Sequence, residues 1–323
     1  VLVGLVAYGV FFLATRPLLF AIFPPLMLVT FRVGRLGVEA AVMLVAVIGG
    51  IATMQGRGPM ILIAADAATQ AQAFQAFLAV TLVTCLPVAA EVTARARLTA
   101  ALAARFPAAR VVAVDGSPQL LDRARDRAER AGHPIEALQT ELPDGFGALP
   151  AADVIWTAQT MHHLGDQSAA VAALAGRLNP GGVLAVAEGG LPSRFLPRDI
   201  GIGRPGLAER LDALQAVGFG EMRAALDGTV DVPEDWPAVL RAAGLRDVRA
   251  RTFLVDRPAP LDDAARAGVA HMLGRYLRMA DRLDPDDADV LRRLTDPEDP
   301  HNVRRRPDVF VLAARTVYIG TAS

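Results

Sequence analysis

The sequence predicts a chain of two parts, an all-α transmembrane segment over residues 1–92 and an open, doubly wound α/β sheet over residues 93–323. Two observations predict this division. Only six charged residues precede Glu91, whereas charges recur every few residues after it. Beyond Arg110, short apolar stretches alternate with helical ones, which is typical of parallel α/β packing.

Composition limits the classes of partner and the redox setting. A formal net charge of -1 argues against a nucleic acid held by bulk positive charge. The single cysteine, Cys85, excludes an internal disulfide. The chain begins at Val1 rather than at a methionine, so we expect further residues upstream.

Three apolar segments account for the first part: Val1–Ala14, Gly37–Met54 and Phe74–Ala90. A helix that crosses a bilayer needs roughly 17–25 apolar residues. The second and third segments approach or reach this length, and we interpret the first as the tail of a longer helix. Burial in a protein core is the alternative for such segments. We therefore expect membrane lipid around residues 1–90.

Arginines predict the orientation of these segments. They flank the stretch between the first two segments and follow the third, at Arg16, Arg32, Arg35, Arg95, Arg97 and Arg105. Three spans place both groups on the same side of the membrane, which the positive-inside rule makes cytoplasmic. The part of the chain after Glu91 is therefore expected in the cytoplasm.

A broken apolar stretch lies between the first two segments. Leu18–Phe31 contains Pro24 and Pro25, which predicts a half-helix or a kinked span. The surrounding motifs are FPPL at Phe23–Leu26, FRVGRLG at Phe31–Gly37, IAT at Ile51–Thr53 and GRGP at Gly56–Pro59. They resemble the closing third of a bacterial membrane-associated sensor domain, over Val1 to about Arg97. The resemblance implies a bacterial inner membrane and an input module without its earlier helices.

An acid ends the first strand of the second part. The apolar run Val111–Val114 leads to Asp115, and Gly116 and Ser117 then turn the chain into a helix at Pro118. A carboxylate at the carboxyl end of a parallel strand can accept hydrogen bonds from both hydroxyls of a ribose. Asp, Gly and Ser before Pro are also good residues for capping a helix. These residues alone leave both interpretations open.

Further elements follow in alternation. Helices are expected at Thr93–Phe106, Gln119–Ala131, Gln167–Leu178, Leu207–Met222, Trp236–Ala243, Leu261–Arg282 and Asp286–Leu294. Strands are expected at Ile135–Gln139, Ala152–Ala158, Gly182–Glu188, Leu245–Leu254 and Asp308–Tyr318. The last two strands fit an antiparallel edge pair. Residues 191–230 are interpreted as a helical insertion.

Four motifs occur in a fixed order along this part: VVAVDGSP, ADVIWTAQTMHHLGD, LNPGGVLAVAEGG and RAAGLRDV. Together they resemble a class I S-adenosylmethionine-dependent methyltransferase, over Thr93 to Ser323. The resemblance implies a Rossmann-like methyltransferase sheet, S-adenosylmethionine as the cofactor and a small molecule as the methyl acceptor.

The resemblance also implies roles for individual residues. Asp115 would hold the ribose hydroxyls, and Gly116 and Ser117 would line the adenosine pocket. Glu141, followed by Leu142, lies where the family places an acid near the adenine amine. At the methionine end, the implied lining residues are Thr157, Ala158 and Gln159.

One departure from the family pattern makes the sheet incomplete. The family begins with a strand and a glycine-rich loop upstream of the ribose-binding acid, but the stretch from Glu91 to Val114 contains no glycine. The glycines further upstream are interpreted as packing or turn residues, at Gly49, Gly50, Gly56 and Gly58. Two hypotheses follow: a membrane-attached methyltransferase, or a truncated or chimeric sensor module whose methyltransferase-like domain no longer binds the cofactor.

Two adjacent histidines, His162 and His163, follow the strand Ala152–Ala158. Adjacent side chains point in different directions and no partner at metal-ligand spacing follows, so we predict no metal site. One of the two could act as a general base, and we take His163 as the candidate catalytic residue. On a later helix, His271 and Tyr276 either face a substrate or lie on an amphipathic surface.

Overall fold

The computed structural model describes residues 2–14, 16, 18–33, 35–63, 66, 68–78, 81 and 99–323. The chain divides into two compact units, Val1–Glu141 and Leu142–Ser323, which we describe separately. Three predictions lie outside the described residues: the boundary after residue 92, the position of Cys85, and most of the apolar segment beyond residue 78.

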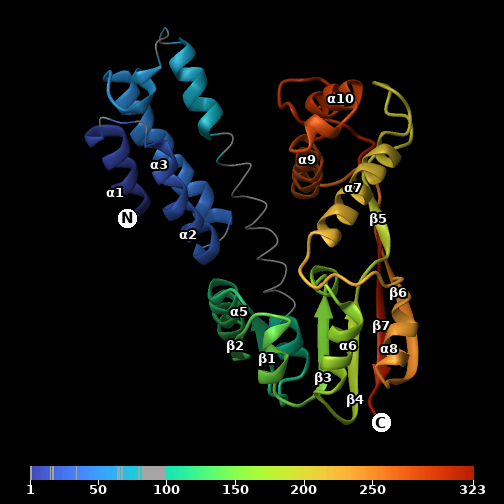
Figure 1. Cartoon of the computed structure of the whole chain (residues 1–323). Helices are drawn as coiled ribbons and strands as arrows, with labels where there is room; N and C mark the ends of the chain where they lie inside the picture. Colours follow the sequence, from blue (N-terminus) through green and yellow to red (C-terminus); the bar gives the residue numbers. More distant parts are fainter. Residues whose placement is uncertain are drawn as a thin grey trace. The chain divides into compact units, whose positions relative to one another are not determined.

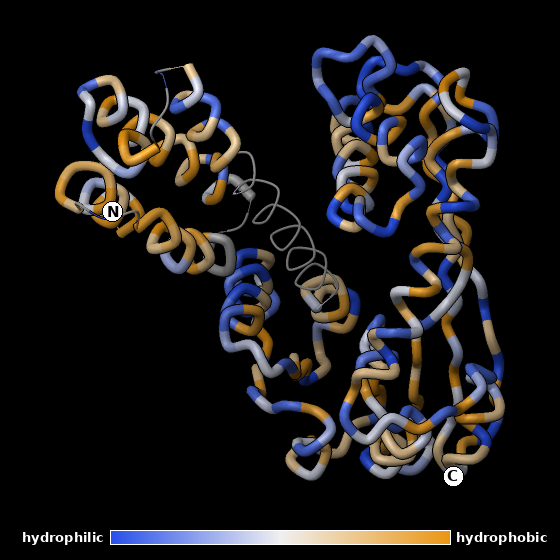
Figure 2. Tube along the Cα trace, turned by 45° about the horizontal axis from the view of Figure 1, so that its top comes forward, coloured by the Kyte–Doolittle hydropathy of each residue, from blue (hydrophilic) through white to orange (hydrophobic). Residues whose placement is uncertain are grey.

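Apolar helices form the first part of unit 1. Helix α1 (Leu2–Tyr8) continues into a π-helical turn (Gly9–Leu13). It packs against α3 (Arg35–Met54), as does α2 (Phe23–Val33), and Figure 1 shows the three helices together. Their shared core is apolar throughout, and Figure 2 shows how much of this segment is hydrophobic. Residues 68–78 are also helical.

The stretch that contains Pro24 and Pro25 forms a short helix, which agrees with the first of the two predicted alternatives, a half-helix, and not with a kinked span. A 3-10 turn (Leu19–Ile22) comes first, and α2 then begins at Phe23. Both prolines therefore lie in the first turn, where the backbone N–H that proline lacks would have no partner within the helix. They start the helix rather than break it.

One helix in the described part of the chain is long and apolar enough to cross a membrane, with its apolar window at Gly37–Met54. This matches the second predicted segment. The apolar helices Leu2–Leu13 and Leu19–Val29 are shorter. Within α3, a Cβ atom on Gly49 would collide with the rings of Phe74 and Phe11, so this glycine serves helix packing as predicted.

A small parallel β-α-β arrangement completes unit 1. Strand β1 (Val112–Asp115) pairs in parallel with β2 (Glu136–Gln139), and Asp115 lies opposite Gln139. Helix α5 (Pro118–Arg130) connects them and contacts both. These elements agree with the predicted strand, helix and strand. Residues 99–105, within the predicted Thr93–Phe106 helix, are helical.

A five-stranded mixed sheet forms the base of unit 2. Strand β3 (Ala152–Ala158) pairs in parallel with β4 (Leu178–Ala187). Strand β7 (Val311–Thr321) is antiparallel to β4, to β5 (Leu191–Arg194) and to β6 (Arg246–Arg257). Because β6 follows β7 over its whole length, β4 and β5 share the other edge of β7. Figure 1 shows these strands running side by side.

The last two predicted strands form an antiparallel pair at the edge of the sheet, as expected, with β6 outermost and β7 next to β4. Two details of this sheet differ from the predictions. Helix α6 (Gln167–Ala175) ends earlier than predicted, because β4 already begins at Leu178, opposite Ala152. Strand β5 was not predicted, because the short segment LPSR carries little apolar character and a proline.

The helices of unit 2 form two groups. Helix α6 packs against β4, and α8 (Trp236–Ala242) packs against β6 and β7. The other group, α7 (Leu207–Ala224), α9 (Asp263–Leu277) and α10 (Pro285–Thr295), shares a second apolar core. Helix α7, which lies in the predicted insertion at 191–230, thus packs with helices from much later in the chain.

Candidate functional site

The turn after β1 has the features of both interpretations made from the sequence. Asp115 Oδ1 accepts a hydrogen bond from the backbone N–H of Ser117, at 2.8 Å. Ser117 is the N-cap of α5, and its Oγ accepts from the N–H of Leu120 at 3.4 Å, with Pro118 in the first turn. Ser117 therefore caps the helix, and the Asp115 carboxylate lies at the carboxyl end of the strand.

Glu141 lies beside this turn. Its carboxylate takes the space that a Cβ atom on Gly116 would need. The side-chain amide of Gln139, on β2, donates to the carbonyl oxygen of Gly116 at 3.3 Å. Unit 1 therefore brings together four of the predicted cofactor-binding residues: Asp115, Gly116, Ser117 and Glu141.

The other predicted cofactor-binding residues belong to unit 2. Leu142 is half-buried. Thr157 and Ala158 lie at the carboxyl end of β3, opposite Val186 and Ala187 of β4. The next residue, Gln159, has a positive φ of 52°. Non-glycine residues in this left-handed region are costly and cluster at ligand sites.

A buried acid follows β4. Glu188 is 3% exposed, and its Oε1 accepts hydrogen bonds from the backbone N–H groups of Thr160 and Met161, each at 2.8 Å. Its Oε2 lies 2.8 Å from Nδ1 of His162. The carboxylate thus joins the carboxyl ends of β3 and β4 and fixes one nitrogen of the imidazole.

Helix α7 holds the same loop from another direction. The guanidinium of Arg223 donates to the carbonyl oxygens of His162 and Gly165, each at 3.1 Å, and also to that of Leu164. The ring of Phe219 lies 5.6 Å from that of His162, between centroids. Loop, strand end and helix therefore fix the position of His162.

The predicted catalytic residue, His163, has a different environment. It is exposed, and its ring lies against that of His162 at a centroid distance of 4.1 Å. The buried carboxylate of Glu188 contacts His162 instead. His163 thus stays a prediction, while the structure singles out His162.

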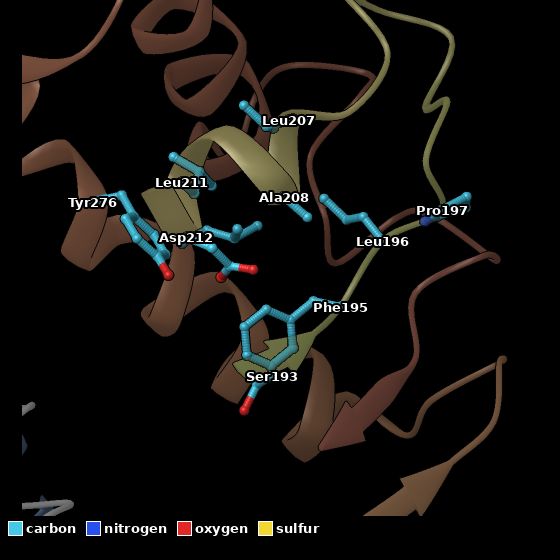
Figure 3. Close-up of a pocket in the computed structure, with 10 residues that line it drawn as sticks. Ser193, Phe195, Leu196, Pro197, Leu207, Ala208, Leu211, Asp212 and Tyr276 are labelled. Carbon is cyan, nitrogen blue, oxygen red and sulfur yellow. The ribbon is translucent and has the colours of Figure 1, made fainter. Parts of the chain in front are cut away.

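A small cavity lies between β5, α7 and α9 (Figure 3). The ring of Tyr276 and the carboxylate of Asp212 line it, and Asp212 forms an ion pair with Arg194. Burial raises the pKa of the Tyr276 hydroxyl, with a further contribution from Asp212. That hydroxyl donates to Gln215 at 2.9 Å. With about 20 Å³, the cavity has room for one water molecule rather than for a metabolite.

No group of three or more metal-ligating side chains occurs within the described ranges.

Comparisons with known proteins bear on the whole arrangement. A family model described as a methyltransferase domain matches residues 93–184. The trans-aconitate 2-methyltransferase of Methylobacterium radiotolerans is 32% identical over 219 residues, which are 62% of this chain and 79% of the relative. The chain belongs to the S-adenosylmethionine-dependent methyltransferases. The enzyme of the same name from Paracidovorax citrulli is 29% identical over 213 residues, 61% of this methyltransferase and 78% of the relative.

Two solved structures are also similar to this methyltransferase. A methyltransferase from Thiobacillus denitrificans, in complex with S-adenosylhomocysteine, is 19% identical, with 69% of this chain and 80% of that chain covered and a TM-score of 0.35. Precorrin-6y C5,15-methyltransferase from Geobacter metallireducens is 14% identical, with 71% and 75% covered and a TM-score of 0.34.

The residues of the β1 turn fit the adenosine part of S-adenosylmethionine, the cofactor of this family. Asp115 is an acceptor at the end of a parallel strand, and Gly116 leaves room for the Glu141 carboxylate next to it. The methionine part has no comparable support before Asp115, because the stretch from Glu91 to Val114 lacks the family's glycines. The family assignment confirms two parts of the first hypothesis made from the sequence, the methyltransferase activity and S-adenosylmethionine as the cofactor; membrane attachment stays a prediction.

Sequence analysis missed three residues of this region: Glu188, Phe219 and Arg223. Glu188 could have been found by the rule that selected Asp115, because it too is an acid at the carboxyl end of a buried strand. Phe219 and Arg223 carry no such pattern. They reach the loop only because α7 packs there, which depends on tertiary structure.

Proposed function

We propose that this protein is a membrane-attached methyltransferase that methylates a small carboxylic acid. The observation that carries the proposal is the 32% identity, over 79% of its length, to an enzyme named trans-aconitate 2-methyltransferase. Trans-aconitate is a small tricarboxylic acid. We infer that this chain, like the relative, acts on a small carboxylic acid.

The chain's own contribution is binding and alignment. Asp115 accepts hydrogen bonds from the ribose hydroxyls, Gly116 and Ser117 line the adenosine, and Glu141 lies near the adenine amine, followed by Leu142. Thr157 and Ala158 line the methionine end. When bound, S-adenosylmethionine supplies a methyl group activated by a sulfonium. Positioning of the reacting groups accounts for a large part of the catalysis in such a design.

A carboxylic acid acceptor suits the limited acid–base machinery of the site. Carboxyl groups are ionised at neutral pH, so the attacking oxygen has no proton to lose. A general base is not required for an acceptor of this class, whereas a hydroxyl acceptor would need one.

Membrane attachment is supported by the apolar helices of unit 1. Large apolar side chains are exposed on them, including Leu5 at 66%, Leu13 at 70% and Met43 at 65%. Only 28% of the Gly37–Met54 window is buried, whereas a core helix of a globular protein is mostly buried. We propose a bacterial inner membrane with the methyltransferase part in the cytoplasm. The resemblance of the first residues to a sensor domain stays a prediction.

Enzyme assays on the full chain, purified in detergent, test the activity. With S-adenosylmethionine and trans-aconitate we expect a methyl ester, detected by mass spectrometry, and a large loss of product with Asp115→Ala. Cofactor binding measured by calorimetry without any ester from trans-aconitate or other small carboxylic acids would contradict the proposed acceptor class.

Membrane attachment is tested separately. A reporter that is active only in the cytoplasm should be active when it is fused after Arg97. The full chain should stay in the membrane fraction after carbonate extraction. Recovery in the supernatant, or a periplasmic reporter, would contradict this part of the proposal.

A further inference from the structure

The loop Thr160–Gly165 presents one imidazole with a single nitrogen left for a ligand. Nδ1 of His162 lies 2.8 Å from the buried carboxylate of Glu188. That carboxylate accepts hydrogen bonds from two backbone N–H groups as well. A carboxylate accepts but does not donate, so Nδ1 carries the proton in this contact. The remaining chemistry of the ring is at Nε2.

Nε2 has no hydrogen-bond partner among the described residues. The side chain of His162 is 16% exposed, so part of the ring is open to a ligand. The loop follows the carboxyl end of β3, beside the carboxyl end of β4. Open α/β sheets bind their ligands outside these strand ends.

Among the described residues, the charged and titratable groups that contact the ring or its loop are Glu188, Arg223 and His163. Glu188, from the end of β4, accepts three hydrogen bonds. Arg223, from α7, is engaged with backbone carbonyl oxygens of the loop. The ring of His163 lies against that of His162 at an angle of 46°, with the centroids 4.1 Å apart. Phe219, also from α7, covers the ring without any charge.

Such a ring can do one of two things. In its neutral form Nε2 offers a lone pair and can remove a proton from an acceptor. In its protonated form Nε2 offers an N–H and can bind an anion. The acceptor of the proposed function is already ionised and has no proton to remove. Anion binding by the protonated ring is therefore the role that this acceptor requires.

We propose that His162, held by Glu188, binds a carboxylate of the methyl acceptor through Nε2–H in its protonated state. The proposal rests on the proposed function, because it requires an anionic acceptor. His162 is thereby a binding residue for the acceptor, and Glu188 is a positioning residue that acts through it.

Two substitutions of His162 test the roles of its two ring nitrogens separately. In His162→Asn the amide nitrogen lies near the place of Nδ1, so the contact with Glu188 is kept and the distal donor is lost. In His162→Gln the amide reaches near Nε2, so a neutral donor is kept and the charge is lost. His301→Asn, on the loop after α10, is the matched control.

The test is a steady-state assay of the full chain with trans-aconitate over a range of pH. We expect the KM of the wild type for trans-aconitate to be lower at acidic than at alkaline pH, because only the protonated imidazole carries a positive charge. His162→Asn should raise KM about tenfold or more at the acidic end, with a small change in kcat, as expected for a lost charge-assisted hydrogen bond. His162→Gln should show a KM without this pH dependence. Glu188→Gln should weaken the pH dependence of KM, and His301→Asn should behave as the wild type.

Several results would overturn the proposal. A methyl ester formed with unchanged KM by His162→Asn shows that the ring does not bind the acceptor, while the proposed function stands. A fall in kcat at low pH that the substitution abolishes assigns the ring as a general base instead. An effect of His163→Asn on KM in place of His162→Asn assigns the anion contact to the neighbouring histidine. A wild type that esterifies no carboxylic acid refutes the proposed function and this inference together.

Discussion

The carboxylate of Glu141 occupies the space next to Gly116 that a side chain at that position would need. The two residues lie 25 positions apart in the numbering, from 116 to 141, and meet because β1 and β2 pair in parallel. Gly116, just after β1, and Glu141, two positions after the end of β2, are thus packed closely at the proposed site of the adenosine part of the cofactor.

Substitution of Gly116 by alanine should therefore impair cofactor binding. The new methyl group must displace the Glu141 carboxylate, which moves a residue assigned to the adenine side. We expect the Kd for S-adenosylmethionine to increase about tenfold or more, a loss of roughly 1.4 kcal/mol or more. Calorimetry on the full chain measures it. Gly220→Ala is the control, since a Cβ there meets nothing within 4 Å in α7. Equal affinities of the two variants would contradict the assignment.

Two substitutions of Asp115 separate its roles in the turn and in binding. Asparagine can still accept the hydrogen bond from Ser117 N–H, but it lacks the negative charge and one acceptor. We expect Asp115→Asn to lower the affinity for S-adenosylmethionine while the melting temperature stays near that of the wild type, and Asp115→Ala to lower both. Asp122→Asn, on the exposed face of α5, controls for charge. Unchanged affinity of Asp115→Asn would exclude the ribose contact.

The pair Arg210–Asp287 should stabilise the helical part of unit 2. The guanidinium of Arg210, on α7, donates to both carboxylate oxygens of Asp287, on α10, at 2.7 and 2.8 Å. Asp287 is 3% exposed, whereas the Arg210 side chain is 32% exposed and also donates to the carbonyl oxygens of Arg204 and Pro205. Because Asp287→Ala removes two charge-assisted hydrogen bonds, we expect it to lower the free energy of unfolding by about 1.5–3 kcal/mol.

Denaturant unfolding, followed by a signal from α7 or α10, measures the change in the free energy of unfolding. Asp289→Ala removes an exposed carboxylate on the same helix, 3.9 Å from Arg292. It should change the free energy of unfolding by less than about 1 kcal/mol. A similar cost for both variants would show that the Arg210–Asp287 pair has no special role.

Acid should weaken the contact of Asp308 with Arg306. The side-chain hydrogen bond from Arg306 lowers the pKa of Asp308 below its ordinary value of 3.8. A carboxyl whose pKa is lower in the folded state contributes stability above the ordinary value, and this contribution is lost as pH falls through the lowered one. Asp308→Asn should therefore be less stable than the wild type at neutral pH, and the difference should shrink below about pH 4. Denaturant midpoints over a pH series measure it, and a difference independent of pH would contradict the expectation.

Local chemistry explains what could be predicted of the site. The turn from Asp115 to Pro118 follows from capping preferences and from an apolar strand before it, and the structure has the expected strand and helix. Gly49 was interpreted as a packing or turn residue, and two aromatic rings do lie against it. Such features can be predicted from the residues around them in the sequence, even where, as at Gly49, the partners are distant.

Contacts between distant residues explain what could not be predicted. Strand β5 forms because β7 offers it an edge, and the segment Leu191–Arg194 has no strand pattern of its own. The choice between His162 and His163 depends on Glu188, which lies 26 positions beyond His162. Both residues are histidines at adjacent positions of one loop, so the sequence does not distinguish them. Only the folded structure does.

The central place of β7 sets an order of events during synthesis. This strand supplies the edges to which β4, β5 and β6 pair, yet it leaves the ribosome after all of them. Until then the nascent chain carries open strand edges, which are prone to wrong pairing. Unit 2 can therefore complete its sheet only once translation has passed Thr321, long after the apolar helices of unit 1 have emerged.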